Sequence, residues 1–239
     1  MYTKCRGEGM DNITLKALAK INLGLDVVRR REDGYHEVRM IMQTIHLYDK
    51  LDIKKTTEEG IEITSNLSYV PTNENNLVYK AGKLLMDEFD IKEGVAVHLQ
   101  KRIPVAAGMA GGSSDAAAML YGMNEIFGLG LSRKDLMERG VKIGADVPFC
   151  IYQKPALAEG IGEKITAIHG LSDNFWILLV NPNEKVSTKK IYEKIDNEVL
   201  YNKTDNKKLA CALKNNDINI LSSELSAYDI ALLLGKELI

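Results

Sequence analysis

A glycine-rich stretch that runs directly into an alanine-rich segment constrains this chain more than any other feature. Residues 104–120 read PVAAGMAGGSSDAAAML. Glycine permits backbone angles and close approaches that a side chain would block, and alanine is a strong helix former. The stretch therefore predicts a loop followed by a helix, with Ser113 or Ser114 as the helix cap and Asp115 in the first turn.

The start of such a helix presents unpaired N–H groups, which form a binding site for anions and for phosphate in particular. The residues alone also allow a flexible loop before a helix. The stretch is not a Walker A loop, because the ending Gly-Lys-Ser/Thr is missing, and no G-x-G-x-x-G fingerprint opens the helix.

The composition excludes several classes of protein. The 239 residues carry a net charge of −2, so no global basic field attracts nucleic acid or an anionic membrane. No run of about eighteen apolar residues predicts a membrane span. The three cysteines stand at unrelated spacings, which argues against a disulfide framework or a zinc site and favours a reducing, cytoplasmic compartment. We therefore expect a cytoplasmic protein without nucleic-acid or membrane partners.

The periodicity of the apolar residues predicts a mixture of strands and helices without internal repeats. We expect strands at 13–28 (or a bent hairpin there), 38–47, 50–56, 60–65, 94–103 and 175–180, and a hairpin at 156–168. We expect helices at 77–89, from the glycine loop to about 127, from Ser132 to about 143, and at 188–195, 207–214 and 221–239. The predicted organisation is a leader (1–12), a first lobe (13–153) and a second lobe (154–239).

Two polar pairs stand out near the N-terminus. Lys20 and Asn22 are two residues apart, so on a strand they project from the same face, which is also what the solvated side of a half-buried strand looks like. Tyr35 and His36 follow the turn signal Asp33-Gly34 and could stack on a base and hydrogen-bond to it. The basic triplet Arg29-Arg30-Arg31 that precedes this turn is typical of a solvated bend.

Asp146 stands in the sequence GADVPF, where Pro148 favours an extended Val147 and a rigid bend. A carboxylate between apolar neighbours is costly unless it has a partner. A functional acid is one interpretation, and an aspartate that caps a turn or helix is the other.

In their order along the chain, the Lys20-Asn22 pair, the Tyr35-His36 pair, the glycine-rich loop and the Asp146 motif resemble the motifs of the GHMP kinases (galactokinase, homoserine, mevalonate and phosphomevalonate kinases). The resemblance covers roughly residues 13–200, including a further segment at 158–163. It implies an α+β fold in two lobes, the first like ribosomal protein S5 domain 2 and the second a ferredoxin-like sandwich. The C-terminal Gly-Ser-Gly-Pro motif of the family is absent from the sequence, so the second lobe is expected to be incomplete.

The resemblance also implies roles for individual residues. Lys20 and Asp146 would be catalytic. ATP would be bound by Asn76, Leu77, Lys101, Pro104, Ala106, Gly108, Gly111, Gly112, Ser113 and Ser114, with Ser114 as a candidate ligand of Mg²⁺. The acceptor would be bound by Asn22, Tyr35, His36, Asp146 and Thr188, with Ser187 nearby.

Within the family, the motif forms are most similar to those of the kinases that act on a cytidyl diphosphate sugar alcohol in the non-mevalonate isoprenoid route. The implied reaction is ATP-dependent phosphorylation of the 2-hydroxyl of the sugar-alcohol part, by a monomer or weak homodimer. One alternative is another small-molecule GHMP kinase. The other is a truncated, non-catalytic nucleotide-binding remnant, which the missing third motif would favour and the intact Lys20 and Asp146 would oppose.

Overall fold

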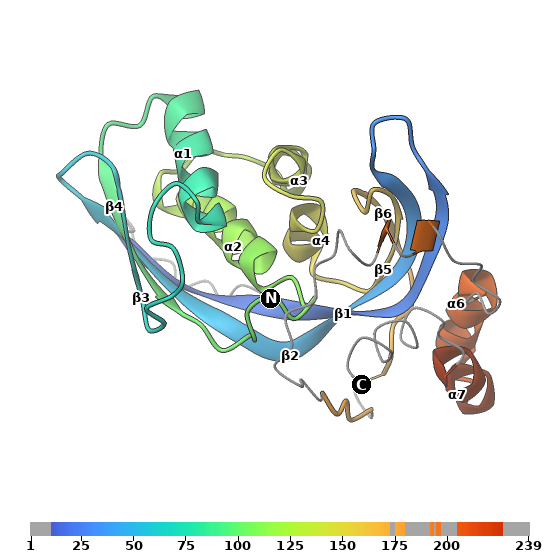
Figure 1. Cartoon of the computed structure of the whole chain (residues 1–239). Helices are drawn as coiled ribbons and strands as arrows, with labels where there is room; N and C mark the ends of the chain where they lie inside the picture. Colours follow the sequence, from blue (N-terminus) through green and yellow to red (C-terminus); the bar gives the residue numbers. More distant parts are fainter. Residues whose placement is uncertain (1–10, 173–174, 180–191, 194, 197–204, 227–239) are drawn as a thin grey trace. The chain divides into compact units, whose positions relative to one another are not determined.

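A computed structural model describes residues 11–172, 175–179, 192–193, 195–196 and 205–226 (Figure 1). The chain divides into two compact units. Unit 1 holds the residues up to Lys20 together with Thr44–Gln153, and unit 2 holds Ile21–Gln43 and the residues from Lys154 onward. Strands β1 (Asn12–Arg30) and β2 (His36–Thr56) are long enough to contribute to both units.

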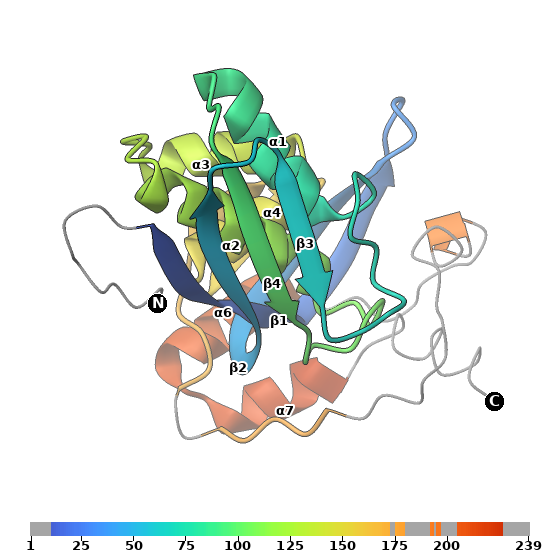
Figure 2. The ribbon, with the colours of Figure 1, turned by 90° about the vertical axis from the view of Figure 1, so that its left-hand side faces the viewer.

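Unit 1 contains a mixed sheet. The second half of β2 runs antiparallel to β4 (Gly94–Gln100), and β3 (Ile61–Ser65) runs parallel to β4. β1 pairs with β2. The parallel neighbours β3 and β4 are connected through helix α1 (Leu77–Phe89), as a parallel pair requires (Figure 2).

The helices α1, α2 (Gly111–Ile126), α3 (Arg133–Val141) and α4 (Val147–Tyr152) cover one face of this sheet (Figure 1). Helix α2 is buried along most of its length. Its small residues permit this burial, since a Cβ atom on Gly122 would lie 2.4 Å from the Ile53 side chain on β2. The alanine-rich sequence is therefore the composition that a closely packed central helix needs.

Unit 2 contains the first half of β2, which pairs antiparallel with β5 (Ala156–Gly160), and β6 (Lys164–Ala167), which pairs antiparallel with β5. It also contains helices α6 (Asn206–Asn215) and α7 (Ile218–Ser226). Its core is a cluster of buried apolar residues: Leu23, Ile41, Leu209, Ala212, Leu213 and Leu221.

Several predicted elements are confirmed, namely the strand at β1, the helices α1, α3 and α6, and the hairpin β5–β6. The two predicted strands 38–47 and 50–56 are in fact one strand, β2. No turn separates the two ranges, because Asp49 is completely buried and accepts hydrogen bonds from protein donors instead of facing solvent.

The buried strand predicted from Phe175 is wrong for residues 175–179, which form no strand. Trp176 is 99% exposed and Leu178 is 88% exposed. An apolar run becomes a buried strand only when a neighbouring strand or layer covers it, and none of the described strands pairs with this segment. Val180 lies outside the described residues.

The C-terminal helix predicted from Leu221 begins earlier, at Ile218. The Asp217 side chain accepts the N–H of Ile220 and so caps the helix start. Residues 227–239 lie outside the described residues, as does most of the helix predicted at 188–195. None of the helices in the described part of the chain is long and apolar enough to cross a membrane.

Candidate active site

A pocket of about 390 Å³ in unit 1 lies against the glycine-rich loop, the start of α2 and the start of α1. This volume falls within the usual range for small-molecule sites. All the residues predicted to bind ATP line it except Ser114. Its lining also includes residues that sequence reasoning missed: Tyr69, Val70, Pro71, Asn75, Leu99, Val105, Ala107, Met109, Ala110 and Asp115.

The loop backbone has an unusual conformation. Ala106, Gly108 and Ala110 have φ angles of 61°, 71° and 56°. Positive φ is natural for glycine but costs energy for alanine, so the surrounding structure must hold these two residues in place. Because Ala110 takes the left-handed N-cap position, α2 begins at Gly111, and the prediction that a serine caps the helix is wrong.

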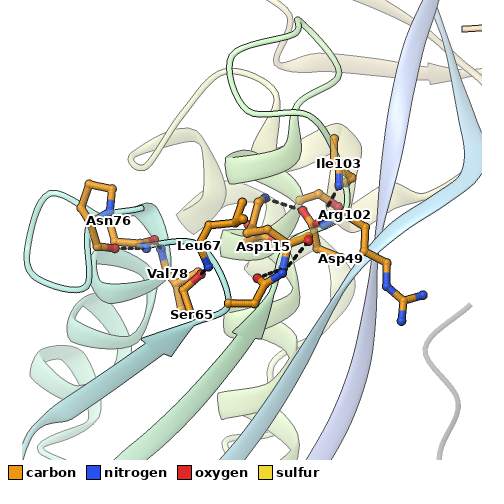
Figure 3. Close-up of polar contacts among 12 residues, drawn as sticks. Asp49, Ser65, Leu67, Asn76, Val78, Arg102, Ile103 and Asp115 are labelled. Atoms are coloured by element: carbon orange, nitrogen blue, oxygen red, sulfur yellow. Dashed lines mark hydrogen bonds and ion pairs between the residues drawn. The ribbon is translucent and has the colours of Figure 1, made fainter. Parts of the chain in front are cut away.

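Asn76 fixes the other side of the pocket. Its side-chain oxygen accepts the N–H of Val78 at 2.9 Å and caps α1, and its amide donates to the carbonyl of Pro71 at 2.6 Å (Figure 3). The Asn-Leu pair predicted beside the nucleotide therefore stands at a helix start whose geometry is fixed by two hydrogen bonds.

Lys20 and Asp146 are brought together. Lys20 Nζ lies 3.9 Å from Asp146 Oδ2, and the backbone N–H of Lys20 donates to the carbonyl of Met109 in the loop. Lys20 is 5% exposed, so the interpretation of a solvated strand face is wrong for it. The Asp146 side chain is 32% exposed and lines the pocket.

Asp146 also occupies the N-cap position of α4, but its side chain makes no capping hydrogen bond. Val147 is the first helical residue, so the predicted extended conformation is wrong. Pro148 is compatible with this helix because the N–H that it lacks would have had no partner in the first turn. The carboxylate of Asp146 is therefore left to face Lys20 and the pocket.

Ser114 has a different place from the one predicted. It is completely buried, its hydroxyl donates to the carbonyl of Leu18 at 2.7 Å, and it does not line the pocket. We therefore do not assign it as a ligand of Mg²⁺. Ser113, its neighbour, does line the pocket.

A buried ionic network lies beside the pocket and was not predicted from the sequence. Lys101 Nζ pairs with Asp49 Oδ2 and, at 2.7 Å, with Asp115 Oδ2. Burial raises the pKa of Asp115 to about 8, because the Lys101 ammonium offsets burial only in part and the Asp49 carboxylate raises this pKa further. The prediction of Asp115 in the first helical turn is wrong, since it is the fifth residue of α2.

Of the residues predicted to bind the acceptor, Asp146 belongs to unit 1, whereas Asn22, Tyr35 and His36 belong to unit 2. The His36 ring is stacked on Tyr192, with centroids 4.5 Å apart, and its Nε2 lies 2.7 Å from Asp196 Oδ1. Tyr35 is 61% exposed, and Asn22 is half-buried on β1. Ser187 and Thr188 lie outside the described residues. Tyr192 and Asp196 were missed, although their spacing of four residues would place them on one face of a helix.

The fold, the loop and the Lys20–Asp146 pair are those expected of the GHMP class of kinases. The family model for the GHMP kinases N terminal domain matches residues 76–154. The chain is 53% identical over 217 residues to 4-diphosphocytidyl-2-C-methyl-D-erythritol kinase of Lachnoclostridium phytofermentans, which covers 91% of this chain and 74% of that protein. It is 50% identical over 216 residues to the enzyme of the same name from Clostridioides difficile, covering 90% of this chain and 73% of that protein.

Among solved structures, a 4-(cytidine 5'-diphospho)-2C-methyl-D-erythritol kinase superimposes with a TM-score of 0.68 at 28% identity, covering 89% of this chain and 76% of the other. The chain therefore belongs to the 4-diphosphocytidyl-2-C-methyl-D-erythritol kinase family. This confirms the predicted family and the predicted α+β fold of the GHMP kinases.

Proposed function

We propose that this chain uses ATP to phosphorylate the 2-hydroxyl of 4-diphosphocytidyl-2-C-methyl-D-erythritol. The observation that carries the proposal is the position of Asp146, which lines the pocket of the glycine-rich loop and lies 3.9 Å from the ammonium of Lys20. An accessible carboxylate paired with a buried cation, beside a helix start that suits phosphate, is the arrangement that transfer of a phosphoryl group to an alcohol requires.

The proposed chemistry follows from these two residues. Asp146 accepts the proton of the acceptor hydroxyl as that oxygen attacks the γ-phosphorus of ATP. Lys20 stabilises the negative charge that develops nearby and orients the Asp146 carboxylate. The first turn of α2 and the loop backbone bind the phosphates, because unpaired N–H groups and the helix dipole favour anions there.

Magnesium would be the metal that accompanies ATP. Among the described residues, no group of three or more His, Cys, Asp or Glu side chains could hold a metal ion. This fits Mg²⁺ bound mainly by nucleotide phosphates and water, the usual mode in kinases. Asp146, the partly exposed carboxylate of the pocket, would be one protein oxygen donor for such an ion. The ion would neutralise charge on the phosphates.

The acceptor is assigned to unit 2. Tyr35 offers an exposed aromatic face for the cytosine base, and His36 offers a ring nitrogen for its polar edge. Asn22 and Thr188 remain predictions as further acceptor contacts. We also expect the reaction to take place in the cytoplasm, carried out by a monomer or weak homodimer.

The test is ADP release by the full chain with ATP, Mg²⁺ and the cytidyl acceptor. Asp146→Asn should bind ATP normally and lose turnover by about 10²- to 10⁴-fold, the range for removal of a general base. Asp52→Asn is the matched control, since this carboxylate lies on β2 and does not line the pocket. Unchanged turnover in Asp146→Asn would contradict the assigned role.

The same assay separates the alternatives. Turnover of mevalonate or homoserine in preference to the cytidyl acceptor would favour a different GHMP kinase. Binding of ATP without turnover of any of these acceptors would favour a non-catalytic nucleotide-binding protein.

A further inference from the structure

The network of Asp49, Lys101 and Asp115 joins three elements that the chain separates widely. Asp49 lies on β2, Lys101 follows the last residue of β4, and Asp115 lies on α2. All three are buried, with at most 7% of any of them exposed. Such a network is costly to bury unless its charges are paired and its hydrogen bonds are satisfied.

The contacts of Asp49 fix the chain just before the glycine-rich loop. Its Oδ1 accepts the N–H of Arg102 at 2.5 Å and that of Ile103 at 2.8 Å, while its Oδ2 pairs with Lys101 (Figure 3). The segment that leads into Pro104 is thereby held against β2 by three interactions with one carboxylate.

Lys101 itself is held at its backbone as well as at its ammonium. Its N–H donates to Asn66 Oδ1 at 2.7 Å, and its carbonyl accepts from Asn66 Nδ2 at 3.1 Å. The ammonium is occupied by the two carboxylates. A side chain bound in this way is poorly placed to reorganise around a nucleotide, even though it lines the pocket.

The start of α2 rests directly on this ammonium. A Cβ atom at Gly111 would lie 3.1 Å from Lys101 Nζ and 3.2 Å from Ile103 Cγ2. The glycine at position 111 is therefore explained by its close approach to the network. The position of the helix start, and with it the phosphate-binding N–H groups, depends on where Lys101 is held.

We infer that Asp49, Lys101 and Asp115 form a positioning unit for the nucleotide pocket, in which Lys101 acts through the two carboxylates and not through contact with the nucleotide. The inference rests on the proposed binding of a nucleotide in this pocket. It replaces the expectation, implied by the family resemblance, that Lys101 binds ATP directly.

The charge balance supports this role. One ammonium faces two carboxylates, and the raised pKa of Asp115 leaves that group mostly protonated at neutral pH, so the unit carries no net charge. A buried thiol nearby, that of Cys150 on α4, stays protonated because burial raises its pKa. Removing Lys101 alone would leave the Asp49 carboxylate without its cation, whereas replacing Asp49 by asparagine at the same time would leave no unpaired charge.

The experiment measures dissociation constants of the full chain for ATP and for inosine triphosphate, which differ at the base edge, without acceptor. Lys101→Met should weaken binding of both nucleotides by the same factor, about tenfold or more, since breaking a buried ion pair is costly. Lys101→Met/Asp49→Asn should recover most of that loss, because no unpaired charge then remains. The asparagine Oδ1 can still accept the N–H groups of Arg102 and Ile103. Asp115→Asn alone should change binding by about threefold or less, because the amide resembles the protonated acid.

Lys50→Met is the control, because Lys50 neighbours Asp49 on the same strand but lies outside the pocket and pairs with the half-exposed Asp52. Failure of the double variant to recover binding, or a changed ratio of ATP to inosine triphosphate affinity in Lys101→Met, would assign Lys101 to direct contact with the nucleotide. Normal binding by Lys101→Met would also overturn the inference.

If Lys101→Met does not fold, Lys101→Met/Asp49→Asn is compared with Asp49→Asn. A different ratio of ATP to inosine triphosphate affinity in these two variants overturns the inference. Failure of the proposed function gives a different result. A wild-type chain that binds no nucleotide contradicts the proposed function. A chain that binds nucleotide but shows no rescue contradicts only the positioning role.

Discussion

Asp115 keeps a proton under conditions in which most aspartates are ionised. Burial beside a second carboxylate raises its pKa to about 8, from an ordinary value of 3.8. Between those two values the folded chain binds a proton that the unfolded chain has released. The free energy of unfolding therefore falls as the pH rises from about 4 to about 8.

Asp115→Asn should remove this contribution. The slope attributable to one such group is at most about 1.4 kcal/mol per pH unit, so the variant should lose less stability than wild type between pH 5 and pH 8. Denaturant unfolding at several pH values measures this difference.

Asp52→Asn is the control for that measurement. Hydrogen bonds from Thr14 and Lys50 lower the pKa of Asp52, although burial opposes them. Its contribution to stability is therefore lost only as the pH falls towards the lowered pKa, and this control should keep the wild-type slope between pH 5 and pH 8. Parallel slopes for wild type and Asp115→Asn would contradict the raised pKa.

His36 offers a second prediction at the level of one residue. Its ring is packed against Tyr192 and hydrogen-bonded to Asp196 within unit 2. Because the proposed role is recognition of the acceptor, His36→Ala should raise the KM for the cytidyl acceptor by about tenfold or more, as loss of a buried hydrogen-bonding group does. The dissociation constant for ATP should stay unchanged.

The matched control for His36→Ala is His98→Ala, which removes an exposed histidine of β4 that hydrogen-bonds to Thr64. Its effects on both constants should be small. An effect of His36→Ala that is confined to ATP would refute the placement of His36 on the acceptor side.

At the level of elements, α3 is stabilised by a complete capping box. The Ser132 hydroxyl accepts the N–H of Asp135 at 3.2 Å, and the Asp135 carboxylate accepts the N–H of Ser132 at 2.8 Å. Ser132→Ala should lower the free energy of unfolding by about 1 kcal/mol, while Ser132→Asp should restore most of it because aspartate also caps helices. Thermal unfolding measures both, and equal losses would contradict a capping role.

Elements with strong local signals could be predicted from the sequence. The helices α1 and α3 carry both a cap and a helical period, and the hairpin β5–β6 carries a glycine turn between alternating residues. Local signals gave wrong predictions where the structure of a segment depends on residues that are distant in the sequence. Asp49 resembles a turn residue until the backbone of Arg102 and Ile103 is known to reach it. The run from Phe175 resembles a buried strand, but residues 175–179 have no described strand beside them.

At the level of the whole molecule, some residues of the candidate site could be predicted from the sequence and others could not. The loop, Lys20 and Asp146 could be predicted because each lies in a short motif whose chemistry is local. The network of Asp49, Lys101 and Asp115 could not, because tertiary folding alone brings residues 49, 101 and 115 together. Ser114 shows the reverse case, since a residue inside the strongest motif has a packing role with Leu18.

The pocket beside the glycine-rich loop, which we propose as the nucleotide site, is lined entirely by residues of unit 1. The core of unit 2 is separate from the core around α2. Nucleotide binding should therefore depend on the core of unit 1 and not on that of unit 2. Leu209 of unit 2 and Leu120 of unit 1 are both completely buried leucines on helices. Truncating either leucine to alanine should lower the free energy of unfolding of the unit that contains it by about 2–5 kcal/mol.

Leu209→Ala should keep the wild-type affinity for ATP while losing turnover of the cytidyl acceptor. Leu120→Ala should weaken ATP binding at the same temperature, because the helix that begins at the phosphate loop is then less stably packed. Calorimetric titration with ATP, alongside ADP release, measures both effects. Equal loss of ATP affinity in the two variants would mean that nucleotide binding requires the cooperative folding of both units, and a pocket that depends on unit 1 alone would then be the wrong description.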